Sequence, residues 1–223
     1  MGRMSVKRPF VFVLPGGAYE VHARHEAEPV ADWLRTAGVD AEVLYYPLAP
    51  SRHPVARDYV ADRIRLVRNS SDRPVGLLGF SAGAHLAGDV AWSATDLNAR
   101  PDFVGLAYPV TDVGDSGHRR SGQNLFGDEV TGLLGSSSNL PAMVAPGGPP
   151  VFIWHTADDE VVPVSHSIQL AAALAQHSVP FELHVFPEGP HGLGLKDGRT
   201  GIWMQLFLSW LSGPALRNHR RVT

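Results

Sequence analysis

A serine with the surroundings of a nucleophile stands near the middle of the chain. Residues 79–83 read G-F-S-A-G and directly follow the apolar run at 74–78. Where a buried strand turns sharply into a helix, small flanking residues let the segments pass closely and the hydroxyl is lifted out of the sheet. The N–H groups of the new helix then point at the reacting centre. The pattern predicts that Ser81 is a nucleophile for acyl transfer, while a plain helix N-cap is the alternative.

A base and an acid for this chemistry follow Ser81 along the chain. His191 lies in a Gly- and Pro-rich loop after the last predicted strand, and Asp159 lies in an acidic loop after the strand before it. The imidazole would take the serine proton, and the carboxylate would orient the imidazole and stabilise its charged form. The order Ser81, Asp159, His191 is the α/β-hydrolase order, unlike that of trypsin or subtilisin.

Other residues could fill these places. Asp158 is adjacent to the favoured acid, and Asp112 follows the fourth predicted strand. His85 lies one turn into the helix after Ser81, so we expect it to support that turn. His155 ends a strand, so we expect it to be buried and hydrogen-bonded. Glu160 is expected to be solvated or to act on a helix dipole.

Residues 14–19 read L-P-G-G-A-Y after the first predicted strand. Backbone N–H groups can face a developing oxyanion only where no side chain blocks them, and paired glycines meet this need. We expect the donors to be the N–H groups of Gly17 and Ala18, together with that of Ala82. A simple Gly-Gly turn is the alternative.

The elements that must position these residues alternate along the chain. Short apolar runs indicate strands covered on both faces, and the segments between them have helical spacing. In one of these segments helical spacing is followed by Val55, Tyr59, Asp62 or Arg63, and Leu66. Alternating strands and helices predict an α/β, doubly wound, mainly parallel sheet of about six or more strands. The strands are expected at 10–14, 41–45, 75–79, 103–108, 151–155 and 181–186, and the helices at 26–37, 55–68, 82–94, 164–176 and 200–211.

Residues 111–150 interrupt the alternation. The segment is too long for a plain connection, so it is expected to be a small cap or lid within a single domain of residues 1–223. An irregular surface excursion is the alternative. Apolar residues that could form short helices there are Phe126, Leu133, Leu134, Leu140 and Met143.

Composition excludes several classes of protein. A net charge of −3 argues against nucleic acid as the main partner, and the absence of cysteine excludes disulfides and thiolate catalysis. No apolar run reaches the length of a membrane span, and no secretory signal pattern is evident, so a cytoplasmic location is expected. The histidines have no metal-ligand register, and the Gly16-Gly17 pair lacks dinucleotide-loop spacing, so no metal or cofactor is expected.

The chain resembles α/β-hydrolases of the bacterial esterase/lipase superfamily, especially the small members that resemble acetyl esterases and acetylxylan esterases. The likeness is carried by residues 15–19, 46–50, 79–85 and 155–163, and by His191. It implies a serine esterase that forms an acyl-enzyme and hydrolyses a small-molecule, short-chain ester, with acetylated carbohydrates among the candidates. Only about nine residues precede the first core strand, so the sheet is expected to be trimmed at its N-terminus, and a homo-oligomer could cover an edge.

The chain departs from this pattern at two positions in the first loop. Pro15 stands where many relatives carry His, and Ala18 where many carry a third Gly.

Two other functions remain open: a peptidase or amidase on the same scaffold, and a catalytically silent binding protein. Esters and amides share a tetrahedral intermediate, so the three residues alone cannot separate an esterase from a peptidase or amidase.

Overall fold

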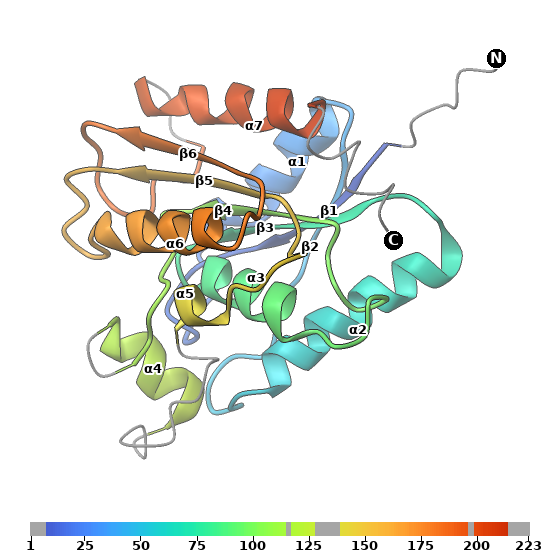
Figure 1. Cartoon of the computed structure of the whole chain (residues 1–223), viewed down its shortest axis with the longest axis horizontal. Coiled ribbons are helices and arrows are strands. Elements are labelled where there is room, and N and C mark those ends of the chain that lie inside the picture. The colour runs from blue at the N-terminus through green and yellow to red at the C-terminus, as the bar shows by residue number, and fades with distance from the viewer. Residues whose placement is uncertain (1–7, 115–116, 128–138, 196–198, 214–223) are drawn as a thin grey trace.

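The protein is built around one parallel sheet, seen in a computed structural model that describes residues 8–114, 117–127, 139–195 and 199–213 (Figure 1). The sheet has six strands in the order β2-β1-β3-β4-β5-β6, and every neighbouring pair is parallel. The central strands are buried along their whole length, as their apolar sequences require. The strands are β1 (Phe10–Leu14), β2 (Asp40–Val43), β3 (Val75–Phe80), β4 (Phe103–Ala107), β5 (Val151–Thr156) and β6 (Phe181–Phe186).

Helices cover both faces of the sheet. In Figure 1, α1 (Glu28–Thr36) and α7 (Trp203–Leu211) lie above the sheet, while α2 (Val55–Ser70), α3 (Ala82–Ser93) and α6 (Ser165–Gln176) lie below it. Two apolar cores fill the layers, one with α1 and α7 and the other with the remaining three helices. The expected α/β doubly wound fold is confirmed, and all carboxyl ends of the strands meet at one edge.

The start of the first predicted helix is wrong. The helix expected from residue 26 begins at Glu28, and a short 3-10 turn, η1 (Arg24–Glu26), precedes it. Pro29 has no N–H and clashes with a preceding helical turn, so it belongs at a helix start. The helix predicted at 55–68 is confirmed as α2, and its residues Val55, Tyr59 and Leu66 are exposed. The buried face consists of the compact side chains Ala56, Val60 and Ile64, which pack closely beside α3.

The interrupting segment contains two short helices, α4 (Arg119–Phe126) and α5 (Leu140–Met143). Leu140 is fully buried and lies over Gly88 of α3, where an added Cβ would be only 2.6 Å from the leucine. Phe126 ends α4, and it packs against the larger core with Met143. Leu133 and Leu134 lie outside the described residues.

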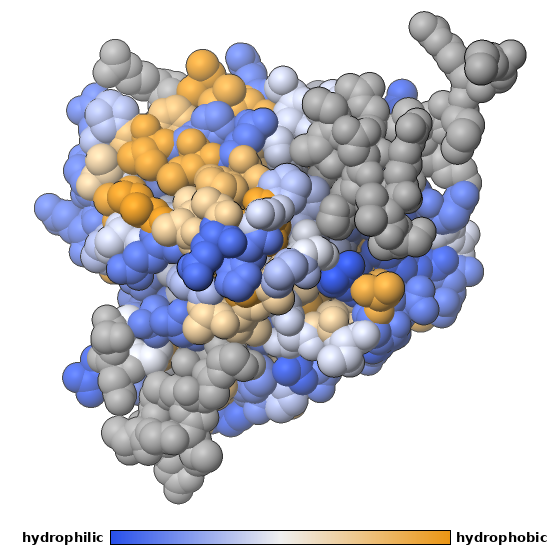
Figure 2. All heavy atoms as spheres, in the orientation of Figure 1, coloured by the Kyte–Doolittle hydropathy of each residue, from blue (hydrophilic) through white to orange (hydrophobic). Residues whose placement is uncertain are grey.

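The surface is divided between polar and apolar regions. Figure 2 shows apolar side chains gathered over the end of the sheet where β6 lies, with mostly polar side chains elsewhere on this face. Val185 of β6 and Ile202 are among the exposed large apolar residues. Among the helices described here, none is both long enough and apolar enough to cross a membrane.

A last short helix, η3 (Arg199–Ile202), leads into α7. Trp203 at the start of α7 is buried and stacks on Trp154 of β5, with ring centroids 5.0 Å apart. The indole N–H of Trp203 donates to the carbonyl of Gly194 at 3.1 Å. This contact fixes the loop after β6, which carries His191, against the end of the sheet.

Candidate active site

Ser81 stands at the strained turn between β3 and α3. Its φ of 52° and ψ of −115° are uncommon for a residue with a side chain. Gly79 and Gly83 make the turn sterically feasible, because a Cβ on Gly79 would lie 2.4 Å from the Gly83 carbonyl oxygen. A Cβ on Gly83 would lie 2.2 Å from the carbonyl oxygen of Leu14. The small residues of the pentapeptide are therefore required by close packing, and helix capping alone does not explain them.

His191 joins Ser81 to Asp159. Its Nε2 lies 2.8 Å from Ser81 Oγ, and its Nδ1 lies 2.7 Å from Asp159 Oδ2. The ring packs edge-on against Tyr108, with centroids 5.0 Å apart. The three residues predicted from the sequence thus lie in one hydrogen-bonded series at the carboxyl edge of the sheet.

Asp159 is held from several sides. Its side chain is fully buried, and Oδ1 accepts hydrogen bonds from the backbone N–H groups of Val161 and Val162, both at 2.9 Å. His155 Nε2 lies 3.2 Å from the same Oδ2 that contacts His191. Burial alone would raise the pKa of Asp159, but hydrogen bonds from His155, His191 and Val162 outweigh it and hold the pKa well below its usual range. The carboxylate is therefore charged beside the imidazole.

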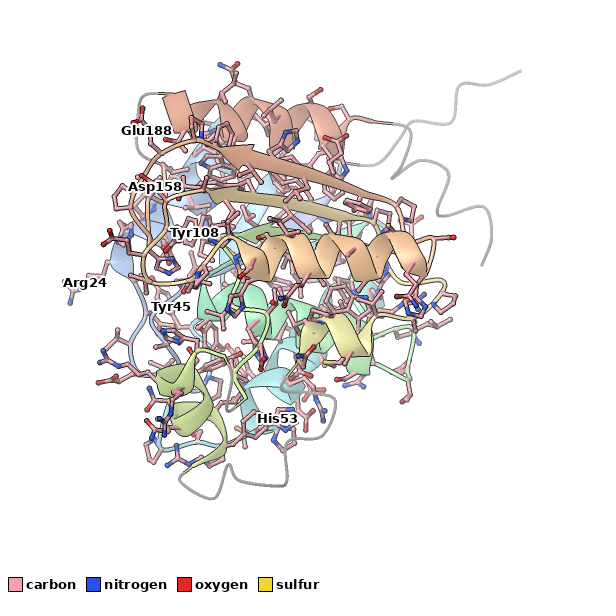
Figure 3. All side chains as sticks on the ribbon, turned by 60° about the vertical axis from the view of Figure 1, so that its left-hand side comes forward. Arg24, Tyr45, His53, Tyr108, Asp158 and Glu188 are labelled. Carbon is pink, nitrogen blue, oxygen red and sulfur yellow. The ribbon has the colours of Figure 1, made fainter. Side chains whose placement is uncertain are left out.

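The competing acids have other contacts. Asp158 is exposed and accepts from the backbone N–H of Gly189 at 2.7 Å. In Figure 3 it lies at the rim near Glu188, with Tyr108 deeper in the molecule. Asp112 forms an isolated bridge with Asn139 and accepts from the N–H of Gly114 at 2.7 Å. Of the three aspartates considered, Asp159 is the one for which a contact with His191 is found.

His155 and His85, the other histidines considered from the sequence, hold loops of the site in place. His155 is fully buried, with Nδ1 2.8 Å from Ser167 Oγ and Nε2 2.9 Å from the Val162 carbonyl oxygen, so it anchors the loop of Asp159. His85 Nδ1 lies 2.7 Å from the hydroxyl oxygen of Tyr19. This pair ties the loop after β1 to α3.

The loop after β1 has an unusual backbone. Gly17, Ala18 and Tyr19 have consecutive positive φ values of 122°, 56° and 61°. A Cβ on Gly17 would lie 2.1 Å from the Val21 carbonyl oxygen, so glycine is required there. No residue in the described segments accepts a hydrogen bond from the backbone N–H of Gly17, Ala18 or Ala82.

Helix α4 contacts this loop from outside. Asn124 Nδ2 donates to the Ala18 carbonyl oxygen at 2.9 Å. Arg120 donates through Nε and one terminal nitrogen to Glu20 Oε2, at 2.9 and 2.6 Å. The interrupting segment therefore stabilises the strained turn of the loop, including Ala18.

Sequence reasoning missed a buried network behind the loop. Glu26 accepts from the backbone N–H of Gly16 at 2.8 Å and from the Tyr108 hydroxyl at 2.6 Å. Tyr46 donates to the Pro15 carbonyl oxygen at 2.6 Å. Burial and the nearby Glu26 charge raise the pKa of both tyrosines. The sequence signal for this network is a glutamate, Glu26, next to the apolar Ala27. The helix predicted at 26–37 includes this glutamate and gives it no buried role.

The polar side chains of the candidate site are arranged for proton transfer among themselves. In the described parts of the chain, no group of three or more His, Cys, Asp or Glu residues is arranged to hold a metal ion. The polar groups at the carboxyl edge instead donate to and accept from one another. The arrangement can perform nucleophilic acyl transfer with proton transfer through an imidazole.

Comparison with known proteins decides the family. A model of the prolyl oligopeptidase family matches residues 58–215, which is well over half of the chain. The chain belongs to the prolyl oligopeptidase family. The matched region of this family member contains Ser81, Asp159 and His191, while the loop after β1 precedes it.

Solved structures similar to this family member include two hydrolases of esters. The acetyl ester-xyloside bifunctional hydrolase from Caldicellulosiruptor lactoaceticus is 37% identical, with a TM-score of 0.88, covering 97% of this chain and 86% of that chain. A carboxylesterase from Lactobacillus plantarum is 27% identical, with a TM-score of 0.81, covering 96% of this chain and 88% of that chain. These similarities confirm the α/β-hydrolase fold.

Curated relatives are longer. An acetylxylan esterase from Xylanibacter ruminicola is 30% identical over 86% of this chain and 41% of its own length. Endo-1,4-beta-xylanase B from Butyrivibrio fibrisolvens is 32% identical over 94% of this chain and 35% of its own length. The family member described here therefore spans well under half of either relative.

Proposed function

We propose that this protein is a serine carboxylesterase that cleaves short-chain esters, acetyl esters above all, through an acyl-enzyme. The observation that carries the proposal is the hydrogen-bonded series from Ser81 Oγ through His191 to Asp159, with distances of 2.8 and 2.7 Å. Each group in the series has the partner that its role requires.

The reaction begins with proton transfer. His191 Nε2 takes the hydroxyl proton of Ser81 while Oγ attacks the ester carbonyl carbon, and Asp159 stabilises the resulting imidazolium. The carbonyl oxygen becomes an oxyanion that faces the backbone N–H groups of Gly17, Ala18 and Ala82. Such preorganised donors are each worth about 3 kcal/mol in the transition state.

The intermediate then collapses in two stages. His191 returns the proton to the leaving alcohol, the carbon–oxygen bond to the alcohol breaks, and the acyl group stays on Ser81. A water molecule next gives a proton to His191 and attacks the acyl carbon. Collapse of this second intermediate releases the carboxylic acid and restores the serine hydroxyl.

Acetylated carbohydrate is the substrate class that the relatives favour. The Xylanibacter protein is an acetylxylan esterase, and the Caldicellulosiruptor enzyme is an acetyl ester-xyloside hydrolase. This chain covers 86% of the Caldicellulosiruptor enzyme, so the matched part includes most of that hydrolase. Acetyl groups on a xylose-based sugar are therefore the first natural substrates to test.

Peptide hydrolysis is the second candidate, because the family model is that of the prolyl oligopeptidases. The two activities separate on matched substrates, a nitrophenyl acetate and an acyl nitroanilide. We expect turnover of the acetate and little turnover of the anilide. The reverse preference would make the protein a peptidase or amidase.

We also propose that residues 1–223 form one domain in which residues 111–150 act as a small cap. The support comes from the contacts of α4 with the loop after β1, made by Asn124 and Arg120. Helix α5 adds a contact with α3, where Leu140 lies over Gly88.

Substitution of the nucleophile tests the mechanism. Ser81→Ala should lower kcat on nitrophenyl acetate by about 10⁵- to 10⁶-fold, because no other group can form the acyl-enzyme. An organophosphonate should label the wild-type protein at Ser81 and leave the variant unmodified, as shown by mass spectrometry. An esterase rate in the variant close to that of the wild type would refute the mechanism, and an unlabelled, inactive wild type would indicate a silent binding protein.

A further inference from the structure

Glu26 is a buried carboxylate that the proposed reaction does not use. Only 2% of the residue is exposed, and its nearest cationic candidate, His25 Nε2, lies 3.6 Å away on a side chain that is 58% exposed. Burying a carboxylate is costly unless hydrogen bonds compensate for the lost hydration. The bonds that compensate here show what Glu26 connects.

One carboxylate oxygen holds the loop after β1. Glu26 Oε2 accepts from the N–H of Gly16, the residue immediately before the proposed donor Gly17. The packing is tight, because a Cβ on Gly16 would lie 2.7 Å from this oxygen and 3.0 Å from the Cβ of Ser81. The position of the carboxylate therefore fixes the peptide that leads into the oxyanion donors.

The other carboxylate oxygen reaches the loop of His191. Glu26 Oε1 accepts from the hydroxyl of Tyr108, which in turn accepts from the N–H of Gly194 at 3.0 Å. The Tyr108 ring also packs against His191, and it is visible in the interior in Figure 3. The neighbouring His25 adds a parallel contact, with Nε2 2.8 Å from the carbonyl oxygen of Gly192.

We propose that Glu26 is a positioning residue that sets the oxyanion donors and the imidazole base at the spacing the transition state needs. This inference rests on the proposed function. The donors Gly17 and Ala18 belong to the loop after β1 and the base to the loop after β6, which are far apart in the sequence. The Gly16–Glu26–Tyr108–Gly194 series is a hydrogen-bonded connection between them.

Three variants test the connection. Glu26→Ala removes both bonds and should lower kcat on nitrophenyl acetate by about 30- to 100-fold, with KM changed by less than about threefold, because loop misplacement affects the transition state most. Tyr108→Phe keeps the ring beside His191 but removes the link to Gly194, and kcat should fall about tenfold. Glu26→Gln can still accept from Gly16 and donate to the Tyr108 oxygen, so it should recover most of the kcat lost in the alanine variant.

Asp102 provides the matched control. Its carboxylate also accepts a backbone N–H, that of Val75 at 2.7 Å, but at the opposite end of β3 from Ser81. Asp102→Ala should lower the melting temperature while leaving kcat unchanged. The rate of Ser81 labelling by an organophosphonate should fall in Glu26→Ala by the same factor as kcat, and should stay at the wild-type value in Asp102→Ala.

The outcomes separate the inference from the function. If wild-type protein hydrolyses the ester and Glu26→Ala or Tyr108→Phe keeps the wild-type kcat, the positioning role is overturned. It is also overturned if Glu26→Gln loses as much as Glu26→Ala, since that would assign the effect to charge. If wild-type protein neither turns over esters nor reacts with the phosphonate, the proposed function fails instead.

Discussion

Two regions at the carboxyl edge each bury a carboxylate, one after β5 and the other after β1. Asp159 and Glu26 both accept hydrogen bonds from backbone N–H groups, and each lies near a histidine. The two carboxylates differ in the groups that they contact. Asp159 contacts the imidazole of His191 directly, while Glu26 acts through a peptide N–H and a tyrosine hydroxyl.

This difference explains why the sequence predicted the role of Asp159 but not that of Glu26. A carboxylate that touches a histidine belongs to a known reaction scheme, and its place after a strand identifies it. A carboxylate that only accepts hydrogen bonds from the backbone leaves no sequence motif, because every residue except proline provides the N–H group that it needs. Such residues are found only when the fold shows what surrounds them.

Between these two regions, the largest effect on kcat is expected for Asp159, and its neighbour Asp158 serves as the comparison. Asp159→Asn should lower kcat by about 10⁴-fold, because the amide cannot hold the charged imidazole in the required orientation. Asp158→Asn is the matched control, and its kcat should stay within about threefold of the wild-type value. Steady-state kinetics on nitrophenyl acetate measure both, and a greater loss in Asp158→Asn would contradict the assignment.

A smaller effect is expected when Glu26 is displaced without being changed. Gly16→Ala places a Cβ 2.7 Å from Glu26 Oε2 and 2.9 Å from the Phe80 carbonyl oxygen, so the loop must move. A shift of about 1 Å at the donors should lower kcat by roughly 100-fold.

Gly147→Ala is the control for this substitution. Gly147 has a positive φ of 77° and no atom within 4 Å of an added Cβ. The substitution should cost about 1 kcal/mol in stability through backbone strain while kcat is unchanged. Equal kcat values for the two alanine variants would show that the loop tolerates displacement.

The smallest effect concerns stability against acid. The folded-state pKa of Asp159 lies below the unfolded value of about 3.9, so the unfolded chain binds more protons as the pH falls. The stabilisation by Asp159 is therefore complete above about pH 4 and is lost as the pH falls toward the folded-state pKa.

Urea unfolding of the wild type and Asp159→Asn between pH 3 and pH 7 tests this sign. The wild type should be more stable at neutral pH by about 2 kcal/mol, since charged hydrogen bonds are lost in the variant. The difference should shrink below about pH 4. A difference that stays constant or grows on acidification would contradict the lowered pKa.

The sequence predicted the order of elements well because its signals are local. Apolar runs bounded by Gly and Pro located all six strands to within a few residues. In α2, however, the larger apolar side chains Val55, Tyr59 and Leu66 are exposed and the compact ones are buried. Burial there depends on how closely α3 approaches, which helical spacing does not specify.

The amino-acid sequence by itself determined the fold class and named the three residues proposed for catalysis, since strand periodicity, the G-x-S-x-G turn and the chain order are all encoded locally. Only the tertiary structure showed the contact between Asp159 and His191, the partners of His155 and His85, and the contacts of Glu26. Those outcomes depend on which side chains meet across loops from different strands. Such distances arise from the packing of the whole sheet and its helices, and no local pattern contains them.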